Sequence, residues 1–188
     1  LSSAASDVYK RQFLEVVASG KEFTSVFISS VLNSVPFAKD REHIVCICAA
    51  LCRPFTKLYA CASSTSETGY RQVNGKAFHN ESNAGNIAFR LEYESGIRIG
   101  DFQDKPKVQK YHTKKEFFDL FSPFFRKVEI SEMTGNVNAK CENVRRIPWE
   151  RLEEALKFEF NLPYPDGSRM ELVDEAISAF RHRYEIFS

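Results

Sequence analysis

The sequence predicts an α/β fold in which short buried strands alternate with helices, and two observations in residues 24–64 support this. Two apolar runs, 25–31 (SVFISSV) and 58–62 (LYACA), flank an almost wholly apolar helical segment. Continuous apolar runs of this length are typical of strands buried on both faces, as in parallel sheets. A strand, a helix and a strand across this length form a right-handed crossover unit, which predicts a doubly wound sheet.

The helix between the two strands is expected over residues 41–52. Asp40 precedes it and has a side chain that suits the N-cap position. Its centre, 44–51 (IVCICAAL), is apolar nearly all round, which is typical of a helix buried in a layer against a sheet. Pro54 follows closely and ends the helix, because proline cannot continue one.

A long polar segment, 65–86, follows the second strand. Loops of this length are more often functional than idle. Residues 87–93 and 97–102 then alternate apolar and polar side chains around a Glu-Ser-Gly turn. This alternation predicts a β-hairpin inserted after the second core strand, and we treat 65–110 as an insertion.

The chain then predicts a helix followed by a closing hairpin. Thr113 and Glu116 have the spacing of a capping box, and phenylalanines recur after them at helical intervals. Residues 128–133 and 138–144 form two strand-like runs around a Gly-Asn pair, which predicts an antiparallel hairpin.

Residues 147–188 are expected to form a helical extension. Pro148 suits the first turn of a helix over residues 149–158. Ser168 and Glu171 have the spacing of a second capping box, which predicts a final helix that runs almost to the last residue.

Residues 1–12 (LSSAASDVYKRQ) differ in character from the sequence that follows. They resemble a translated sequencing adapter of the kind found at the ends of metagenomic reading frames, and we exclude them from the fold as a non-native leader. A natural disordered leader is the alternative. Under the first interpretation the native protein was cut upstream of about Phe13. Residues 13–21 predict the tail of a helix that ends at Gly20.

The composition limits the classes of molecule that the protein is expected to bind. The net charge is +1 with both signs interspersed, so the sequence lacks the electrostatic footprint of a nucleic-acid or anionic-membrane protein. The longest apolar run is far shorter than the roughly 20 residues that span a bilayer. We therefore expect no membrane association and disfavour a nucleic-acid partner.

Five cysteines raise the question of a metal site, because three of them, Cys46, Cys48 and Cys52, fall in one predicted helix. Only Cys48 and Cys52 share a helix face, and no histidine or second cysteine pair supplies the other ligands. We favour buried reduced thiols over metal binding, which predicts a reducing, cytoplasmic compartment.

The order of strand, helix, strand, insertion, helix and closing hairpin resembles strands four to seven of class I S-adenosylmethionine-dependent methyltransferases. The resemblance rests on the order of strands and helices and on their apolar or polar character more than on invariant residues. The matching stretches are 26–35 (VFISSVLNSV), 40–54 (DREHIVCICAALCRP), 56–63 (TKLYACAS) and 111–130 (YHTKKEFFDLFSPFFRKVEI). The resemblance implies a partial Rossmann-like sheet over residues 13–146, with 65–110 as the acceptor-binding region.

The resemblance also implies a site. In that family the loop after the fourth strand lines the methionine end of the cofactor and faces the methyl acceptor. The residues that occupy this place are Ser29, Ser30, Val31 and Asn33. The candidates for binding the methyl acceptor come from the insertion and its exit. They are Tyr70, His79, Tyr111 and His112. A polar turn at a strand end, and packing or surface roles for the acceptor candidates, are the alternatives.

No catalytic residue is assigned, because methyl transfer is an in-line displacement in which positioning supplies most of the catalysis. The family binds its cofactor at a glycine-rich first turn, and none of the eight glycines here forms G-x-G. We therefore expect strands one to three to be missing and the fragment to be inactive alone.

A tetrapeptide at 161–164 spells N-L-P-Y and resembles the amine-methylating motif of ribosomal RNA adenine dimethyltransferases. In those enzymes the motif directly ends a buried strand. Here it follows a predicted helix and runs into Pro-Asp-Gly, so we interpret it as a turn.

The leading hypothesis is a methyltransferase fragment acting on a small-molecule acceptor. A non-catalytic α/β binding module or partner subunit related to methyltransferases is the alternative. Another doubly wound enzyme, such as a reductase, is disfavoured by the antiparallel closing hairpin.

Overall fold

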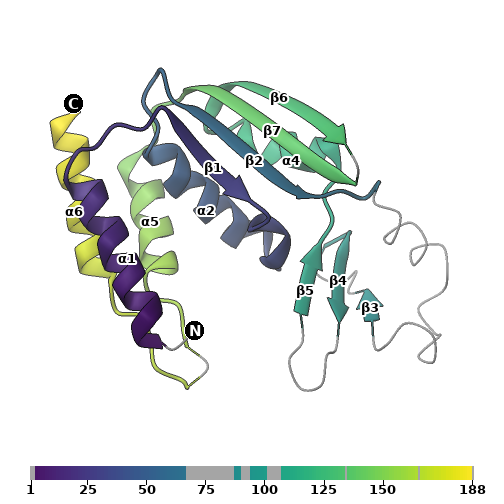
Figure 1. Ribbon diagram of the computed structural model, residues 1–188, viewed down its shortest axis with the longest axis horizontal. Coiled ribbons are helices and arrows are strands. Elements are labelled where there is room, and N and C mark those ends of the chain that lie inside the picture. The colour runs from purple at the N-terminus through teal and green to yellow at the C-terminus, as the bar shows by residue number, and fades with distance from the viewer. Residues whose placement is uncertain are drawn as a thin grey trace.

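The computed structural model describes residues 3–66, 87–89, 94–100, 107–133, 135–164 and 166–187 (Figure 1). Its helices are α1 (Ser3–Ala18), the short 3-10 helix η1 (Leu32–Ser34), α2 (Ala38–Ala50), α4 (Lys114–Phe121), α5 (Trp149–Glu159) and α6 (Val173–Ile186). Its strands are β1 (Ser25–Ser29), β2 (Lys57–Ser63), β3 (Ile87–Phe89), β4 (Ile97–Gly100), β5 (Lys107–Lys110), β6 (Phe125–Met133) and β7 (Asn136–Val144). The protein has the α/β fold that the sequence predicts.

The main sheet has four strands in the order β1-β2-β7-β6. β1 and β2 are parallel and are connected by α2, which confirms the predicted crossover unit. β6 and β7 form the predicted antiparallel hairpin, and β7 lies between β2 and β6. Gly135 at the hairpin turn has a φ of +79°, a conformation that glycine adopts without the steric cost of a Cβ.

Within the described part of the chain, helices cover only one face of this sheet. α2 and α4 lie against it on the same side in Figure 1. Leu58, Ala60 and Ala62 of β2 point into the core and are buried, whereas Tyr59 between them is only partly buried. Phe27 on the neighbouring strand is 71% exposed. The prediction that the first two strands are buried on both faces is therefore wrong.

The remaining helices extend the covered side instead of covering the other face. α5 packs on α2, and α6 packs against both α5 and α1. Arg183 of α6 is buried in this layer, where it donates hydrogen bonds to the carbonyls of Lys21 (2.8 Å) and Leu51 (2.9 Å). This side chain links the C-terminal extension to the ends of α1 and α2.

Two of the predicted helix starts are confirmed. The Thr113 hydroxyl accepts a hydrogen bond from the Glu116 amide (3.1 Å), and the Glu116 carboxylate accepts one from the Thr113 amide (2.7 Å), so the capping box is present. Pro148 is the N-cap of α5.

Two other predicted starts are wrong. α2 begins at Ala38 with Phe37 as its N-cap, so Asp40 lies within the first turn. α6 begins only at Val173, because Ser168 hydrogen-bonds Asp166 in the preceding turn and Glu171 has a φ of +53°. A serine followed three residues later by a glutamate is compatible with either a helix N-cap or a turn, and in this protein the turn forms.

The segment predicted to lie outside the fold is largely helical. α1 begins at Ser3 and runs without a break past Phe13, and Arg11 forms an ion pair with Glu175 of α6 (2.5 Å). The alternative of a disordered leader is therefore wrong, whereas its foreign origin stays a prediction. The helix ends at Ala18, and Gly20 has a φ of +70°, close to the predicted end.

The insertion contains a second sheet, with the order β3-β4-β5. Antiparallel pairing of β3 with β4 confirms the predicted hairpin. β5, which pairs with β4, was not predicted as a strand. In Figure 1 this small sheet lies beside one end of the main sheet.

Two ionisable side chains, Lys10 and Glu159, are partly buried where α1 approaches α5. The Lys10 ammonium lies 4.9 Å from the centroid of the Phe160 ring. Burial lowers the pKa of Lys10. Burial also raises the pKa of Glu159 to about 7, although the charge of Lys10 opposes this shift. The ionised carboxylate is therefore destabilising in the folded state.

We predict that Glu159→Gln increases the free energy of unfolding by roughly 1–2 kcal/mol at about pH 8 and by much less at about pH 5. The pKa of Glu159 in the fold, about 7, lies above the value of 4.5 for an unperturbed carboxyl, so stability is lost as pH rises between these values. Urea unfolding followed by circular dichroism at both pH values measures this. The exposed Glu185→Gln serves as the control, and an equal gain at both pH values contradicts the prediction.

Candidate functional site

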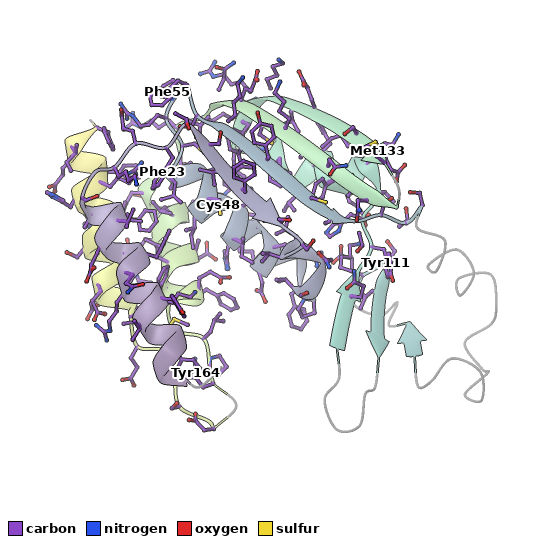
Figure 2. The ribbon with its side chains drawn as sticks, viewed as in Figure 1. Phe23, Cys48, Phe55, Tyr111, Met133 and Tyr164 are labelled. Carbon is purple, nitrogen blue, oxygen red and sulfur yellow. The ribbon has the colours of Figure 1, made fainter. Side chains whose placement is uncertain are left out.

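Ligands of open α/β sheets bind outside the carboxyl ends of the parallel strands. In this protein β1 and β2 end beside the insertion, and Tyr111 lies at the junction of the two sheets (Figure 2). We therefore describe this end of the sheet as the candidate site.

The loop after β1 has a strained backbone and a buried anchor. Ser30 has a φ of +57°, which costs a residue with a Cβ about 1 kcal/mol or more. Its amide donates a hydrogen bond to the carbonyl of Cys61 on β2 (2.9 Å). Leu32, the first residue of η1, is fully buried, whereas Ser29, Ser30 and Val31 are exposed. Three of the four predicted cofactor-binding residues are therefore accessible.

Asn33 connects this loop to the insertion. Its side-chain amide donates to Gln109 Oε1 (3.3 Å), and Gln109 Nε2 donates to Ser63 Oγ (2.7 Å). We call this chain of hydrogen bonds the Asn33–Gln109–Ser63 bridge. It holds β5 against the carboxyl ends of β1 and β2. Asn33 Oδ1 is buried and has no hydrogen-bond partner within the described residues.

His112 follows directly and is almost fully buried, with 1% of its surface exposed. Its backbone amide donates to the carbonyl of Ser63 (2.8 Å), and its ring packs edge-on against Phe117 with the centroids 5.3 Å apart. Among the residues that the structure describes, neither ring nitrogen has a hydrogen-bond partner. Burial and the nearby charges of Lys110 and Arg41 lower the pKa of His112 to about 3, so the ring is neutral at physiological pH.

Two buried cations fix the exit of the insertion. Lys110 is 0% exposed and lies 2.9 Å from carboxylate oxygens of both Glu94 and Glu116. Arg41 of α2 is 3% exposed and pairs with the same Glu94. Burial opposes ionisation of Glu116, but hydrogen bonds from Thr113 and Lys110 outweigh it and lower the pKa of this carboxyl. The four charges balance, and they tie the insertion to α2 and α4.

A groove of about 390 Å³ opens beside this cluster. Its lining includes His112, Arg41, Glu94, Glu116 and Leu120. Tyr111 is buried, and its amide donates to the carbonyl of Gly96 (2.9 Å). Of the predicted acceptor residues, His112 therefore reaches the groove, while Tyr70 and His79 lie outside the described residues.

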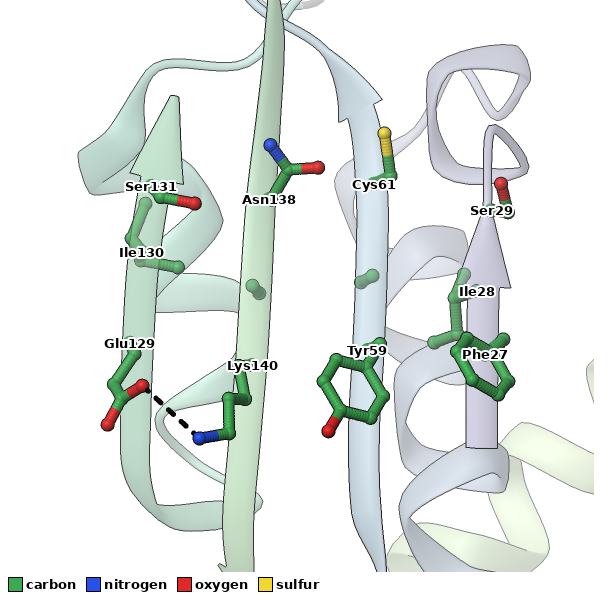
Figure 3. A pocket seen from close by; sticks show the side chains of 12 residues that line it. Phe27, Ile28, Ser29, Tyr59, Cys61, Glu129, Ile130, Ser131, Asn138 and Lys140 are labelled. Atoms are coloured by element: carbon green, nitrogen blue, oxygen red, sulfur yellow. Dashed lines mark ion pairs between the residues drawn. The ribbon is translucent and has the colours of Figure 1, made fainter. Parts of the chain in front are cut away.

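A second hollow, of about 400 Å³, lies on the uncovered face of the sheet (Figure 3). The rings of Phe27 and Tyr59 stack there with centroids 5.4 Å apart, and Lys140 pairs with Glu129 (3.6 Å) beside them. Ser29 lines this hollow, whereas Asn33 is directed at Gln109. The four predicted cofactor-binding residues thus do not all face one cavity.

All five cysteines are free thiols. Burial raises the pKa of Cys48, Cys52 and Cys141 to about 12 and that of Cys46 to about 11. Within the described part of the chain, no three histidine, cysteine or acidic side chains are grouped so that they could hold a metal ion. No described helix is long and apolar enough to cross a membrane.

The sequence indicated that the loop after β1 and the exit of the insertion belong to the site. It did not indicate that Gln109, Lys110, Arg41 or Glu94 do. The only local signal for this group was the capping box, because Glu116 both caps α4 and pairs with Lys110. The other contacts join residues far apart in the sequence.

Two solved structures share part of this architecture. One is an S-adenosylmethionine-dependent methyltransferase from Methanosarcina mazei, with 17% identity, a TM-score of 0.48, and coverage of 66% of this chain and 61% of the other. The second is a protein from Pyrococcus horikoshii, with 11% identity, a TM-score of 0.48, and coverage of 66% and 53%. The chain thus spans less than two thirds of either length. No family model and no curated protein matches the sequence.

We predict that Lys110→Met destabilises the protein by about 3 kcal/mol, because it leaves Glu94 and Glu116 with one buried cation between them. Chemical unfolding at neutral pH measures the loss. Lys115→Met is the matched control, since Lys115 is 83% exposed and its pair with Asp119 is a surface salt bridge. Equal effects of the two substitutions would show that the buried ion pairs do not stabilise the fold.

Proposed function

We propose that this chain is the C-terminal half of a class I S-adenosylmethionine-dependent methyltransferase that acts on a small-molecule acceptor. The observation that carries this proposal is the Asn33–Gln109–Ser63 bridge. It holds the loop that the resemblance assigns to the cofactor against the strand that leads into the predicted acceptor residue His112. An in-line methyl transfer requires the donor and the acceptor to be held side by side.

The strand topology supports the same proposal. The resemblance implies two parallel strands joined by a helix, then an insertion, a helix and a closing antiparallel hairpin. The sheet has this order, with β1 parallel to β2 and with β7 antiparallel to both β2 and β6.

Residue roles follow from the exposed loop after β1 and from buried polar groups that have no hydrogen-bond partner within the described residues. The residues Ser29, Ser30, Val31 and Asn33 would contact the methionine end of S-adenosylmethionine. Asn33 Oδ1 would accept a hydrogen bond from it, because this oxygen has no partner within the described residues. Neutral His112 would offer one hydrogen-bond donor and one acceptor to the substrate from the wall of the groove. We also propose that three further residues contact the methyl acceptor, namely Tyr70, His79 and Tyr111.

The charged side chains of the groove favour a small methyl acceptor, either uncharged or of mixed charge, over a nucleic acid. The groove presents acidic and basic side chains together, and Lys39, Arg41, Glu42, Glu94, Glu116 and Asp119 all line it. A polyanion requires a basic surface instead. Five free thiols favour a reducing, cytoplasmic location.

A non-catalytic binding module related to methyltransferases is the second candidate. The observation that favours it is the absence of any G-x-G among the eight glycines of the sequence. Such a module would keep the fold and the groove without binding the cofactor.

Titration of the ¹⁵N-labelled chain with S-adenosylhomocysteine separates the two candidates. We predict millimolar affinity, because only the methionine end of the cofactor finds its loop here. Amide shifts are expected at residues 30–33 and at His112, and adenosine alone is expected to leave them unchanged.

Asn33→Ala is expected to remove these shifts, because it deletes both the bridge and the free acceptor oxygen. Asn161→Ala, which changes the same residue type in the N-L-P-Y turn, is the control. No shift at any concentration favours the binding module, and an affinity tighter than about 10 µM contradicts the proposal that this is half of a cofactor site.

A further inference from the structure

A large groove lies at the opposite end of the main sheet from the candidate site. Its volume is about 860 Å³, which suits a small-molecule ligand. Its walls come from three segments: the turn between α2 and β2, the linker from β7 to α5, and the carboxyl end of α6. In Figure 1 these segments lie at the end of the sheet that is remote from the insertion.

Positive charge predominates among the side chains of this groove. Its charged members are Arg53, Arg145, Arg146, Arg183 and Glu150, and we call it the arginine groove. Arg53 pairs with Glu22 (3.3 Å), whereas the other three arginines form no ion pair within the described residues. Glu150 is exposed to solvent. Because the chain as a whole has a net charge of only +1, the groove is a local concentration of positive charge.

Arg183 is the buried cation of this group, with 2% of its surface exposed. Its two terminal nitrogens donate to the carbonyls of Lys21 and Leu51, beside the ends of α1 and α2. Carbonyls at helix ends carry only partial negative charge, so they offset part of a full positive charge. A buried charge without an ionised partner is costly. An anion nearby would therefore stabilise Arg183.

Arg53 places a second cation near Arg183. Both guanidiniums contact the ring of Phe187, with Cζ 4.0 Å from the ring centroid for Arg53 and 5.0 Å for Arg183. Burial, and then the charge of Arg53, lower the pKa of Arg183. Glu22, whose side chain is 48% exposed, opposes this shift only in part. The groove thus holds two neighbouring cations whose repulsion an anionic ligand would offset.

Several hydrogen-bond donors of the groove remain available to a ligand. Arg145 Nε donates to the carbonyls of Ser122 (3.3 Å) and Phe125 (3.1 Å), which leaves its terminal nitrogens without a described partner. Arg146 is exposed and has no hydrogen-bond partner for its side chain among the described residues. In the same part of the chain, no side chain caps the first turn of α5, which also lines the groove. Backbone amides at a helix N-terminus bind phosphate and other anions.

The rest of the lining favours an organic ligand over a bare ion. It is mainly apolar or aromatic and includes Ala49, Ala50, Val144, Ile147, Tyr184 and Phe187. Pockets for small molecules are typically apolar with a few placed polar groups. A phosphate group presents three acceptor oxygens and nearly two negative charges, so several arginines can bind it at once. A carboxylate offers only two oxygens and one charge.

We propose that the arginine groove binds a small organic phosphate. The phosphate group would lie at Arg53, Arg146 and the first turn of α5, and the organic part would lie on the apolar wall. This site is independent of the proposed methyl transfer, because the groove lies at the amino end of β2 and the candidate site lies at its carboxyl end.

Titration of the ¹⁵N-labelled full chain with phenyl phosphate at about pH 7.5, where the phosphate is doubly ionised, tests the proposal. The expected dissociation constant is on the order of 0.1–1 mM, since a ligand of this size makes few contacts. Amide shifts are expected at residues 145–150 and 183–187. Inorganic phosphate and benzoate are each expected to bind about threefold more weakly or worse, because each lacks part of the recognised group. Phenol, which lacks the charge, is expected to cause no shift at the same concentrations.

Arg146→Gln is expected to weaken the binding of phenyl phosphate about fivefold, because it removes a charge-assisted hydrogen bond to the phosphate. Arg146 is exposed, so the substitution is expected to leave the fold intact. Arg169→Gln is the matched control. It removes the same charge from an exposed position in the turn before α6, where Arg169 donates to the Asn161 carbonyl (3.0 Å), and it is expected to leave binding unchanged.

Several results overturn the proposal. These are no shift up to about 20 mM phenyl phosphate, an equal loss of affinity in the two variants, or binding of phenol or benzoate as tight as that of phenyl phosphate. Capture of the chain by phosphatidylserine vesicles without binding of phenyl phosphate also overturns it, and would assign the arginines to a membrane surface. The methyltransferase proposal is tested at residues 30–33 and His112 with a different ligand, so the two proposals stand or fall separately.

Discussion

The handedness of two strand connections determines most of this structure. Both the β1–β2 connection and the helical connection from β2 toward β6 proceed in the same direction across the sheet, and right-handed geometry then puts α2 and α4 on the same face. The later helices pack onto that layer, where Arg183 ties α6 to the ends of α1 and α2. One face of the sheet and one edge are consequently left without a covering element among the described residues.

The same constraint places the candidate site. Because the parallel strands both end beside the insertion, β5 at the exit of the insertion packs against the loop after β1. Buried charge is what holds this contact: Lys110 and Arg41 share Glu94, and Lys110 also binds Glu116, which caps α4. Burying charges is costly unless each one is paired, so loss of any member of this cluster would leave a partner charge buried without compensation.

Periodicity was enough to predict the crossover helix, both hairpins and the strands other than β5, because alternating and continuous apolar patterns can be recognised in contiguous residues. The helix starts at Asp40 and Ser168 were wrong because capping residues also form turns, and local sequence does not decide between them. Burial of β1 was overestimated because Phe27 is apolar in sequence but faces the uncovered side. Gln109 had no signal, since both its partners are distant in the chain.

The outer edge of β1 bears on the proposed function. The Thr24 carbonyl and the Ser30 amide hydrogen-bond β2, so the amide and carbonyl groups of Ser25, Phe27 and Ser29, which alternate with them, point away from β2. The resemblance implies that further strands of a complete methyltransferase sheet belong at this edge. Each backbone group accepts one ladder partner, so any strand that completes the sheet there must pair with these three residues.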